Sequence, residues 1–396
     1  MTETVHTGRD ERLFTGYTGR LLIGVSLGWA LIQTGRLVIS PLLPAIIGDL
    51  GISSTRAGFA ITVLWGLYAV MQYPSGRLSD QLSRTTLLVA GLVLIAVGFV
   101  VISGAVTYLV FLVGAAVVGL GAGIYPTPAR GLLSDLFVAR RGQAFGLHTG
   151  SGDTGGVIAA GLATLVLGLA TWRAAFLPVA AAIGAVAVAL HYWSREEYVL
   201  TRVDLALGDT GKRLLREPRL RWMLLSYSLF AFTWQSTVGF LPTYLRIGKE
   251  LSPAVANTGF AALFVVGALA KPVAGGVGDR LSRGLLAAVL LAVAATMLAV
   301  LTVATTTLVV LTAVICFAVG LMAFPPVMQA YLMDSFPDDS MAGDLGAMRS
   351  VYIGVGALGP TYVGVVADAF DYDVAFTGLV GCLLVSSLLL LTVRQR

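Results

Sequence analysis

Apolar runs of about eighteen or more residues recur along the whole chain, and each can cross the roughly 30 Å hydrocarbon layer of a membrane as a helix. Only 12% of the 396 residues are charged, about half the share that is usual in a soluble domain, while 57% are hydrophobic. A soluble chain of this length would lack the charged surface that it needs. The pattern therefore predicts an all-α membrane protein with many spans.

The polar segments between these runs divide them into twelve membrane-spanning helices. Their expected positions are 20–43, 55–75, 85–104, 107–131, 142–168, 174–194, 219–244, 254–274, 284–304, 307–332, 343–366 and 374–393. A long polar interruption from Ser194 to Arg221 separates the sixth span from the seventh. The expected organisation is a cytoplasmic tail at 1–19, a six-helix half at 20–194, a cytoplasmic linker at 195–218 and a second six-helix half at 219–396.

The basic residues set the expected orientation. With both termini in the cytoplasm, eighteen of the 26 Lys and Arg residues lie in cytoplasmic segments or at the cytoplasmic ends of spans, four lie in outer loops and four lie deeper within spans. Positive charge concentrates in cytoplasmic loops of membrane proteins, so we expect a multi-pass protein of the cell membrane with both ends inside. The first twenty residues lack the apolar core of a signal peptide. The basic residues form no arm or single face, so the pI near 9.3 does not indicate nucleic acid.

Two loops of the same pattern, GRLSDQLSR and GGVGDRLSR, follow the second and the eighth expected spans. Their aspartates, Asp80 and Asp279, are 199 positions apart, and the same offset carries Asp135 onto Asp334. The two halves are therefore expected to be parallel structural repeats. Parallel repeats occur in alternating-access carriers, whose substrate site lies near the midplane between the halves.

The loop GRLSDQLSR resembles the Gly-x-Leu-x-Asp-x-x-Gly-Arg motif of the major facilitator superfamily, with Ser83 in place of the second glycine. The resemblance covers the whole chain and implies the fold of that superfamily, with twelve transmembrane helices in two parallel six-helix repeats. It also implies a gate at which the two aspartates accept hydrogen bonds across the seam between the halves. The residues assigned to this gate are Gly76, Asp80, Arg84, Gly275, Asp279 and Arg283. The alternative is a solvated turn whose charges only set the topology.

Arg36 lies near the middle of the first expected span, where an arginine costs about 2.5–3.5 kcal/mol to insert. With Trp29, Gln33 and Ser40 it forms a polar stripe on one helical face, because the spacings are 4, 3 and 4. We expect this stripe to line a wet cavity; the alternative is an arginine buried against backbone carbonyls. The offset of 199 places Gln235 of the seventh span opposite Arg36.

Three further basic residues lie within spans and are candidate substrate contacts: Arg130, Lys271 and Arg349, the last with Tyr352 on its helical face. They lie nearer the cytoplasmic ends of their spans than Arg36 does. The alternative is therefore a structural role, as side chains that snorkel to the surface or pair with Asp80, Asp135 or Asp344.

The fifth expected span contains an acid deep within it, Asp153, and also His148. Asp153 continues a face of glycines that step by four and favour a close helix contact, while His148 projects to a different side. A buried carboxylate or imidazole can carry a coupling proton. One of the two is expected to face the cavity, and the sequence leaves open which. His148 could instead be a satisfied polar residue at a helix contact, and Asp153 could simply neutralise one of the arginines.

Four basic residues and one acid lie away from the ends of the spans, and they leave a surplus of three positive charges, which an anion would relieve. Arginine also binds carboxylate or phosphate through its planar fork. We therefore expect a secondary carrier, a monomer surrounded by membrane lipid, that moves a small carboxylate and is coupled to protons or to a counter-anion. The alternative is a proton-coupled exporter of drugs or other amphipathic compounds, whose cavity would be mostly apolar.

Subfamily resemblance is mixed, and one part of it favours an anionic substrate. The stretch GAGIYPTPARGLLSDLFVARRGQAFG is similar to organic-anion carriers of the superfamily, both anion:cation symporters and oxalate/formate-type exchangers. The resemblance to the symporters implies that Arg36 and Arg130 lie near the substrate. The resemblance to the exchangers implies the same for Lys271 and Arg349.

An enzyme is the alternative from a different class. His148 and Asp153 are candidate acid–base groups, but no serine elbow, metal-ligand cluster or phosphate loop accompanies them in the sequence. Cys316 and Cys382 both lie in apolar runs and imply neither a disulfide framework nor a metal site. The sequence therefore indicates a carrier without a cofactor.

Overall fold

The computed structural model describes residues 11–196, 217–336 and 341–394, and these residues form helices joined by short turns. Each of the twelve expected spans is present as a helix or as a pair of consecutive helices. Much of the expected tail at 1–19 and most of the expected linker at 195–218 lie outside the described residues.

The helices fall into two groups along the chain. The first helix group contains α1 (Gly16–Leu37), α2 (Ile39–Leu50), α3 (Ser54–Gln81), α4 (Arg84–Ser103), α5 (Tyr108–Ile124), α6 (Pro126–Leu136), α7 (Arg141–Leu169), the short 3₁₀ helix η1 (Trp172–Ala175) and α8 (Phe176–Trp193). The second helix group contains α10 (Pro218–Thr243), the π-helical turn η2 (Tyr244–Gly248), α11 (Pro253–Gly278), α12 (Arg283–Val303), α13 (Thr307–Met333), α14 (Met341–Gly356), α15 (Gly359–Ala369) and α16 (Tyr372–Arg394). We propose that these groups are the two six-helix halves expected from the sequence.

Three spans are broken into two helices near a proline, which lacks the amide hydrogen that a helix needs. Pro41 leaves a carbonyl of the preceding turn without its donor, and α1 gives way to α2 at Val38. Pro128 does the same for the carbonyl of Ile124, where α5 meets α6. Ser75 of α3 compensates, because its hydroxyl donates to the Ile124 oxygen at 2.6 Å. The third break separates α14 from α15.

In the described part of the chain, ten spans are long and apolar enough to cross a membrane by composition alone. The other two are α3 and α10, in which buried polar residues interrupt the apolar pattern. These residues are Gln72, Ser75 and Ser79 of α3, and Ser226, Ser228, Thr233, Gln235, Ser236 and Thr237 of α10. Polar side chains in a membrane span usually face the protein interior, so α3 and α10 are central helices of the bundle.

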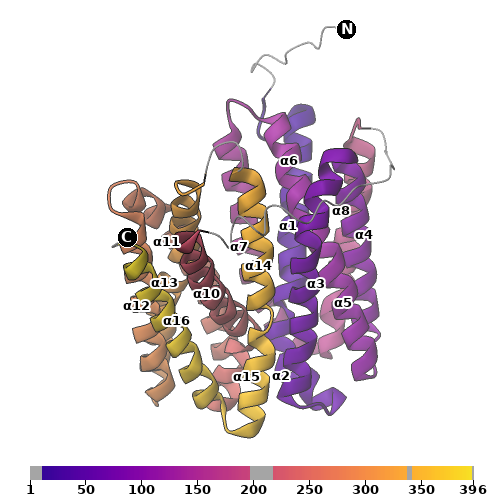
Figure 1. Cartoon of the computed structure of the whole chain (residues 1–396). Helices are drawn as coiled ribbons and strands as arrows, with labels where there is room; N and C mark the ends of the chain where they lie inside the picture. Colours follow the sequence, from indigo (N-terminus) through magenta and orange to yellow (C-terminus); the bar gives the residue numbers. More distant parts are fainter. Residues whose placement is uncertain (1–10, 197–216, 337–340, 395–396) are drawn as a thin grey trace.

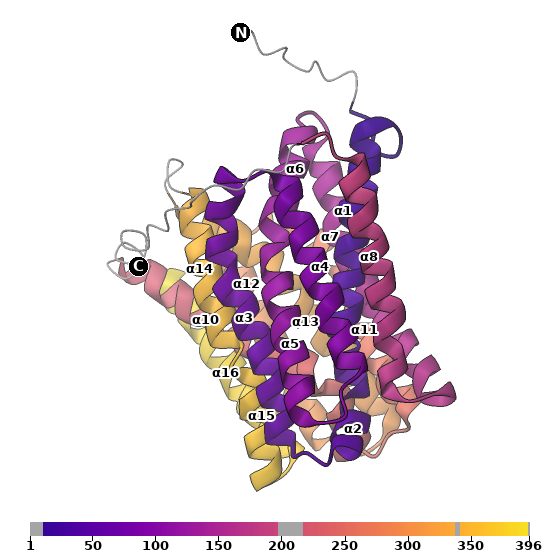
Figure 2. The same cartoon turned by 90° about the vertical axis from the view of Figure 1, so that its right-hand side faces the viewer.

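The two groups stand side by side, with α3 against α14 and α15, α7 against α11, and α2 against α10 (Figures 1 and 2). At the end that carries α2 and α15, at the bottom of Figure 1, hydrogen bonds join the groups directly. Ser40 donates to the carbonyl of Gly239 at 2.9 Å, and Thr361 donates to the hydroxyl of Thr62 at 2.7 Å.

At the same end, an acidic residue also joins the two helix groups. The carboxylate of Asp368 accepts the backbone N–H groups of Ser54 and Thr55 at 3.0 and 2.8 Å. Asp368 ends α15, and the two amides begin α3, so a carboxylate of one group caps a helix of the other. At the opposite end, Arg84 and Arg283 each bind an acid of their own group. The bundle is therefore closed at the end of α2 and α15.

Candidate functional site

Two adjoining cavities lie between the helix groups. The first, of about 260 Å³, we call the Arg36 cavity, and it is lined by Arg36, Gln33, Asp153, Gln235, Lys271, Arg349 and Tyr352 together with several aromatic side chains. The second, of about 240 Å³, we call the Arg130 cavity, and its lining includes Arg130, Gln72 and Thr127. The linings share Tyr227, Gln329, Arg349 and Tyr352. The predicted substrate contacts therefore come together in one place, from five different spans.

Two aromatic rings hold the guanidinium of Arg36 in the first cavity. The group lies 4.1 Å from the ring of Trp65 and 4.5 Å from the ring of Tyr68, both on α3, in cation–π contacts. Its Nη1 donates to Gln33 Oε1 at 3.4 Å. Its Nε and Nη2 are buried without a hydrogen-bond partner, and the residue is only 5% exposed. The alternative, an arginine buried against backbone carbonyls, requires carbonyl acceptors for these two nitrogens. In the described residues, no backbone carbonyl accepts from either of them.

The rest of the predicted stripe divides between the cavity and the closed end. Trp29 and Gln33 line the Arg36 cavity, whereas Ser40 bonds across the interface to Gly239. Gln235 lies in the cavity lining as expected, and its Nε2 donates to the carbonyl of Ile353 at 3.1 Å.

Arg349 lines both cavities, and Arg130 lines the second. The Nη2 of Arg349 lies 3.5 Å from the hydroxyl of Tyr68, and its Nε is buried without a partner. Beside it, the ring of Tyr352 stacks on that of Tyr227 with centroids 4.0 Å apart. Arg36 and Arg349, from different helix groups, thus approach the same tyrosine from two sides.

Lys271 is the one predicted contact with a visible counter-charge. Its Nζ lies 2.6 and 2.7 Å from the two carboxylate oxygens of Asp153, and the pair joins α11 to α7 across the two groups. Asp153 is therefore the acid that faces the cavity, a point that the sequence left open. It neutralises the lysine rather than an arginine. His148 is 4% exposed and packs with its ring 6.0 Å from that of Trp29, away from both cavity linings.

The charges of the site do not cancel. Among the described residues, no carboxylate lies within ion-pairing distance of Arg36, Arg130 or Arg349. Asp135 pairs with Arg84 instead, and the side chains of Asp80 and Asp344 lie outside the description. Arginine keeps its charge at neutral pH. The two cavities therefore hold three guanidinium charges, the surplus that was expected from the sequence.

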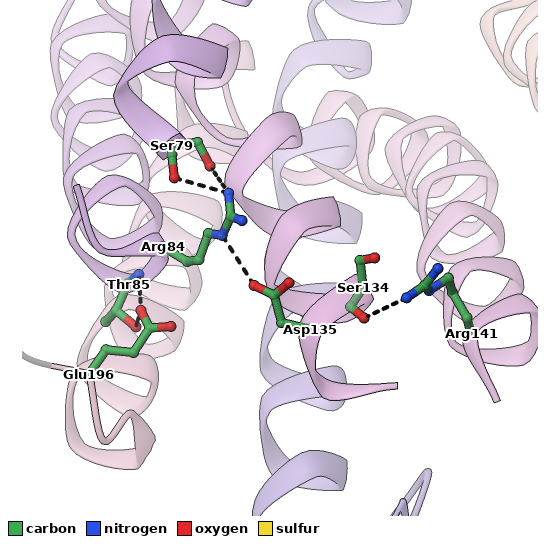
Figure 3. A network of polar contacts seen from close by, with 7 residues as sticks. All are labelled: Ser79, Arg84, Thr85, Ser134, Asp135, Arg141 and Glu196. Atoms are coloured by element: carbon green, nitrogen blue, oxygen red, sulfur yellow. Dashed lines mark hydrogen bonds and ion pairs between the residues drawn. The ribbon is translucent and has the colours of Figure 1, made fainter. Parts of the chain in front are cut away.

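The residues predicted to form a gate lie at the end of the bundle opposite to α2 and α15. Arg84 donates to Ser79 and approaches Asp135 at 3.4 Å (Figure 3). Arg283 repeats this arrangement 199 residues later, at 2.5 Å from Asp334 and 3.2 Å from Asp279. We call these the Arg84 cluster and the Arg283 cluster. The ion pairs of each cluster lie within one helix group.

The positions of the other predicted gate residues follow from the helices that contain them. Gly76 and Gly275 lie in the last turns of α3 and α11, and the side chain of Asp80 is outside the described part of the chain. The gating role of the six residues stays a prediction, and the described side chains of the two clusters form no ion pair across the seam.

Sequence reasoning missed the aromatic lining. Trp65 and Tyr68 hold the Arg36 guanidinium, and Trp65 also meets Trp234 of α10 edge to face, with centroids 5.5 Å apart. The signal was present in the spacing, because Trp65, Tyr68 and Gln72 recur at three and four positions along one face of α3. An aromatic stripe beside a glutamine in a span marks a helix that faces a cavity.

Comparison with known proteins places the chain in a family. Residues 25–360 match the profile of the Major Facilitator Superfamily. The chain is 27% identical to the probable sulfoacetate transporter SauU of Cupriavidus necator, over 40% of this chain and 38% of that protein. It is 26% identical to the probable L-galactonate transporter of Escherichia coli, over 61% of this chain and 57% of that one. It is also 26% identical to the protein named transcription regulatory protein OpdE of Pseudomonas aeruginosa, over 100% of this chain and 98% of that protein.

A solved structure agrees on the fold. A bacterial homologue of the human lysosomal transporter Spinster, in an inward-facing and occupied conformation, superposes with a TM-score of 0.85. The superposition covers 96% of this chain and 97% of that one, at 16% sequence identity. Two groups of six spans, a charged site between them and a family profile over most of the sequence lead to one conclusion. The chain belongs to the Major Facilitator Superfamily and is a multi-pass membrane transporter, not an enzyme.

Proposed function

We propose that this transporter carries a small organic anion, a carboxylate, by alternating access. The observation that carries the proposal is the set of three guanidinium groups, Arg36, Arg130 and Arg349, in adjoining cavities without a carboxylate partner among the described residues. Buried charges are costly unless they are paired, so an anion gains more in this site than a neutral molecule or a cation does. The relatives named for sulfoacetate and L-galactonate support the same class of substrate.

The coupling proposal rests on Asp153 and Lys271. Their ion pair joins the two helix groups at the cavity wall, at 2.6 Å. Protonation of Asp153 would break the pair and release Lys271, which adds a fourth positive charge to the site. Proton binding and anion binding then favour each other, as symport requires. A counter-anion that binds the same arginines is the other form of coupling we propose.

The exporter alternative draws on the aromatic part of the lining. Trp29, Trp65, Trp234 and Phe264 would suit an amphipathic compound. These rings do not remove the cost of three positive charges, and two of them face guanidinium or histidine groups. The anion carrier is therefore the function that we propose, with both termini in the cytoplasm of the cell and the closed end of α2 and α15 outside.

The test is a ligand-stabilisation screen on the purified protein. Small carboxylates, the amides of the same acids and lipophilic cations are compared by the shift in melting temperature that each produces. We expect stabilisation by carboxylates and none by the matched amides, followed by uptake of a labelled carboxylate into proteoliposomes. Stabilisation by lipophilic cations, with no response to any anion, would support the exporter instead.

A further inference from the structure

We infer that the substrate is a dianion, a compact molecule with two acidic groups, of which one binds Arg36 and the other binds Arg349 and Arg130. This inference rests on the proposed function and sharpens it. It follows from which guanidinium nitrogens are buried without a hydrogen-bond partner, from the positions of the arginines in two cavities and from the charge of the whole site.

The position of the first acidic group follows from the unpartnered edge of Arg36. The rings of Trp65 and Tyr68 pack against this guanidinium at 4.1 and 4.5 Å, and the two rings lie edge to face with their centroids 5.5 Å apart. Nη1 is engaged by Gln33, whereas Nε and Nη2 are buried and have no partner. The N–H groups of Nε and Nη2 point in the same direction and form the side-on fork that grips two oxygens of one acidic group. One carboxylate or sulfonate fills this edge completely.

The position of the second acidic group follows from Arg349, which belongs to the second helix group. One acidic group held by the fork of Arg36 leaves the buried Nε of Arg349 without an acceptor. Of these two cavities, Arg349 lines both, Arg36 lines only the Arg36 cavity and Arg130 lines only the Arg130 cavity. The three arginines thus follow one another from one cavity into the next, with Arg349 between. A second group beside Arg349 would lie in the Arg130 cavity, within reach of both its arginines.

The charge count agrees with two acidic groups. Lys271 is neutralised by Asp153, so the site has three uncompensated positive charges among the described residues. A monoanion would leave two of them facing each other in a poor dielectric, and a dianion leaves one. Cavities of about 260 and 240 Å³ are each small for a ligand pocket, so the two groups must be carried on a short skeleton.

The experiment compares acids that share a carbon skeleton and differ by one acidic group. The pairs are propionate with malonate, butyrate with succinate, 2-oxovalerate with 2-oxoglutarate, and 2-methylbenzoate with phthalate. Each is titrated against the purified full chain by thermal stabilisation, at a pH at which both groups of the diacid are ionised. We expect the tightest diacid to bind at least about tenfold more strongly than its monoacid, the ratio that one charge-assisted hydrogen bond to a buried group supplies.

Two variants locate the second group. Arg349→Gln is expected to remove the preference for the diacid and to keep binding of the monoacid, because the fork of Arg36 is intact. Arg36→Gln is expected to weaken binding of both acids. Arg219→Gln is the matched control, since Arg219 is exposed at the start of α10 and contacts Tyr331, outside both cavities.

The outcomes separate the inference from the proposed function. Equal affinity for monoacid and diacid in every pair, measured on the unaltered protein, would overturn the dianion and leave the anion carrier in place. A diacid preference that survives in a folded Arg349→Gln protein would overturn the assignment of the second group. No response to any acid, together with stabilisation by neutral or cationic compounds, would overturn both proposals.

Discussion

At the scale of single residues, Arg36 shows how much a rule about burial can predict. An arginine in the middle of a span was expected to face a cavity, and it does, because the membrane offers no other place for its charge. The rule gave no account of its orientation. That is set by Trp65 and Tyr68 of α3, which meet α1 only in the folded bundle.

The Arg36→Gln variant tests this residue directly. We expect binding of carboxylates to weaken about tenfold to a hundredfold, because two charge-assisted hydrogen bonds to a buried group are lost. We also expect the melting temperature of the ligand-free protein to stay the same or to rise, since an unpaired buried charge is removed. Calorimetric titration and thermal unfolding measure the two effects. Ordinary affinity for carboxylates in the variant would show that the substrate binds elsewhere.

Asp153 gives a second prediction at this scale. If this carboxylate carries the coupling proton, Asp153→Asn should make uptake of the anion independent of pH, because an amide cannot release Lys271 by protonation. The comparison is His148→Gln, which alters a residue outside both cavity linings and should keep the pH dependence. Initial rates of uptake into proteoliposomes over a range of pH distinguish the two. A pH profile that is unchanged in Asp153→Asn would assign the proton to another group.

At the scale of helices, α3 joins the site to the closed end of the bundle. Its middle carries Trp65 and Tyr68, and its first turns pack against α15 so closely that a Cβ at Gly58 would collide with the carbonyl of Pro360. We expect Gly58→Val to push α3 and α15 apart at this end and to favour the opposite opening. Gly66 is the control, because its Cβ position is in open space, so Gly66→Val should have little effect.

The measurement for this pair is the accessibility of a cysteine at the closed interface. Val238→Cys, on α10, is buried next to Ser40 and Gly239 in the described structure, so a membrane-impermeant thiol reagent reaches it only when this end opens. The native Cys316 and Cys382 are replaced by alanine beforehand. Faster labelling in Gly58→Val than in Gly66→Val is expected, and equal rates would mean that the close packing of α3 and α15 does not hold the end shut.

The helices themselves were predictable within a few residues, because hydropathy is a local property of the sequence. Their breaks were not predicted, although Pro41 and Pro128 lie next to two of them. The ion pair of Lys271 with Asp153 was not predicted either, because the partners are 118 positions apart and lie in different helix groups. Local patterns thus predicted which charged residues line the two cavities, while the partners of these residues depended on how the two groups dock.

At the scale of the whole molecule, the two ends of the bundle are held in different ways. At the end of the bundle that contains the predicted gate residues, the ion pairs repeat at an offset of 199 and lie within each group. They are Arg84 with Asp135 and Arg283 with Asp334. The other end has hydrogen bonds between the groups, centred on Asp368. A carrier that opens its sites alternately must break the second set of contacts to expose the arginines to that side, so Asp368 is the residue whose removal should shift the resting conformation.

The prediction for Asp368 follows from helix electrostatics. Its carboxylate accepts two free N–H groups at the start of α3, where the helix dipole favours a negative charge, an interaction of about 0.5–2 kcal/mol. Asp368→Asn keeps the shape and removes the charge, so we expect the Val238→Cys reporter to be labelled several-fold faster in the absence of substrate. Asp371→Asn is the control, because Asp371 caps its own helix through the N–H of Val374 at 2.7 Å and joins no second group. If Asp368→Asn is labelled no faster than Asp371→Asn, closure of this end depends on packing of the helices and not on the capping acid.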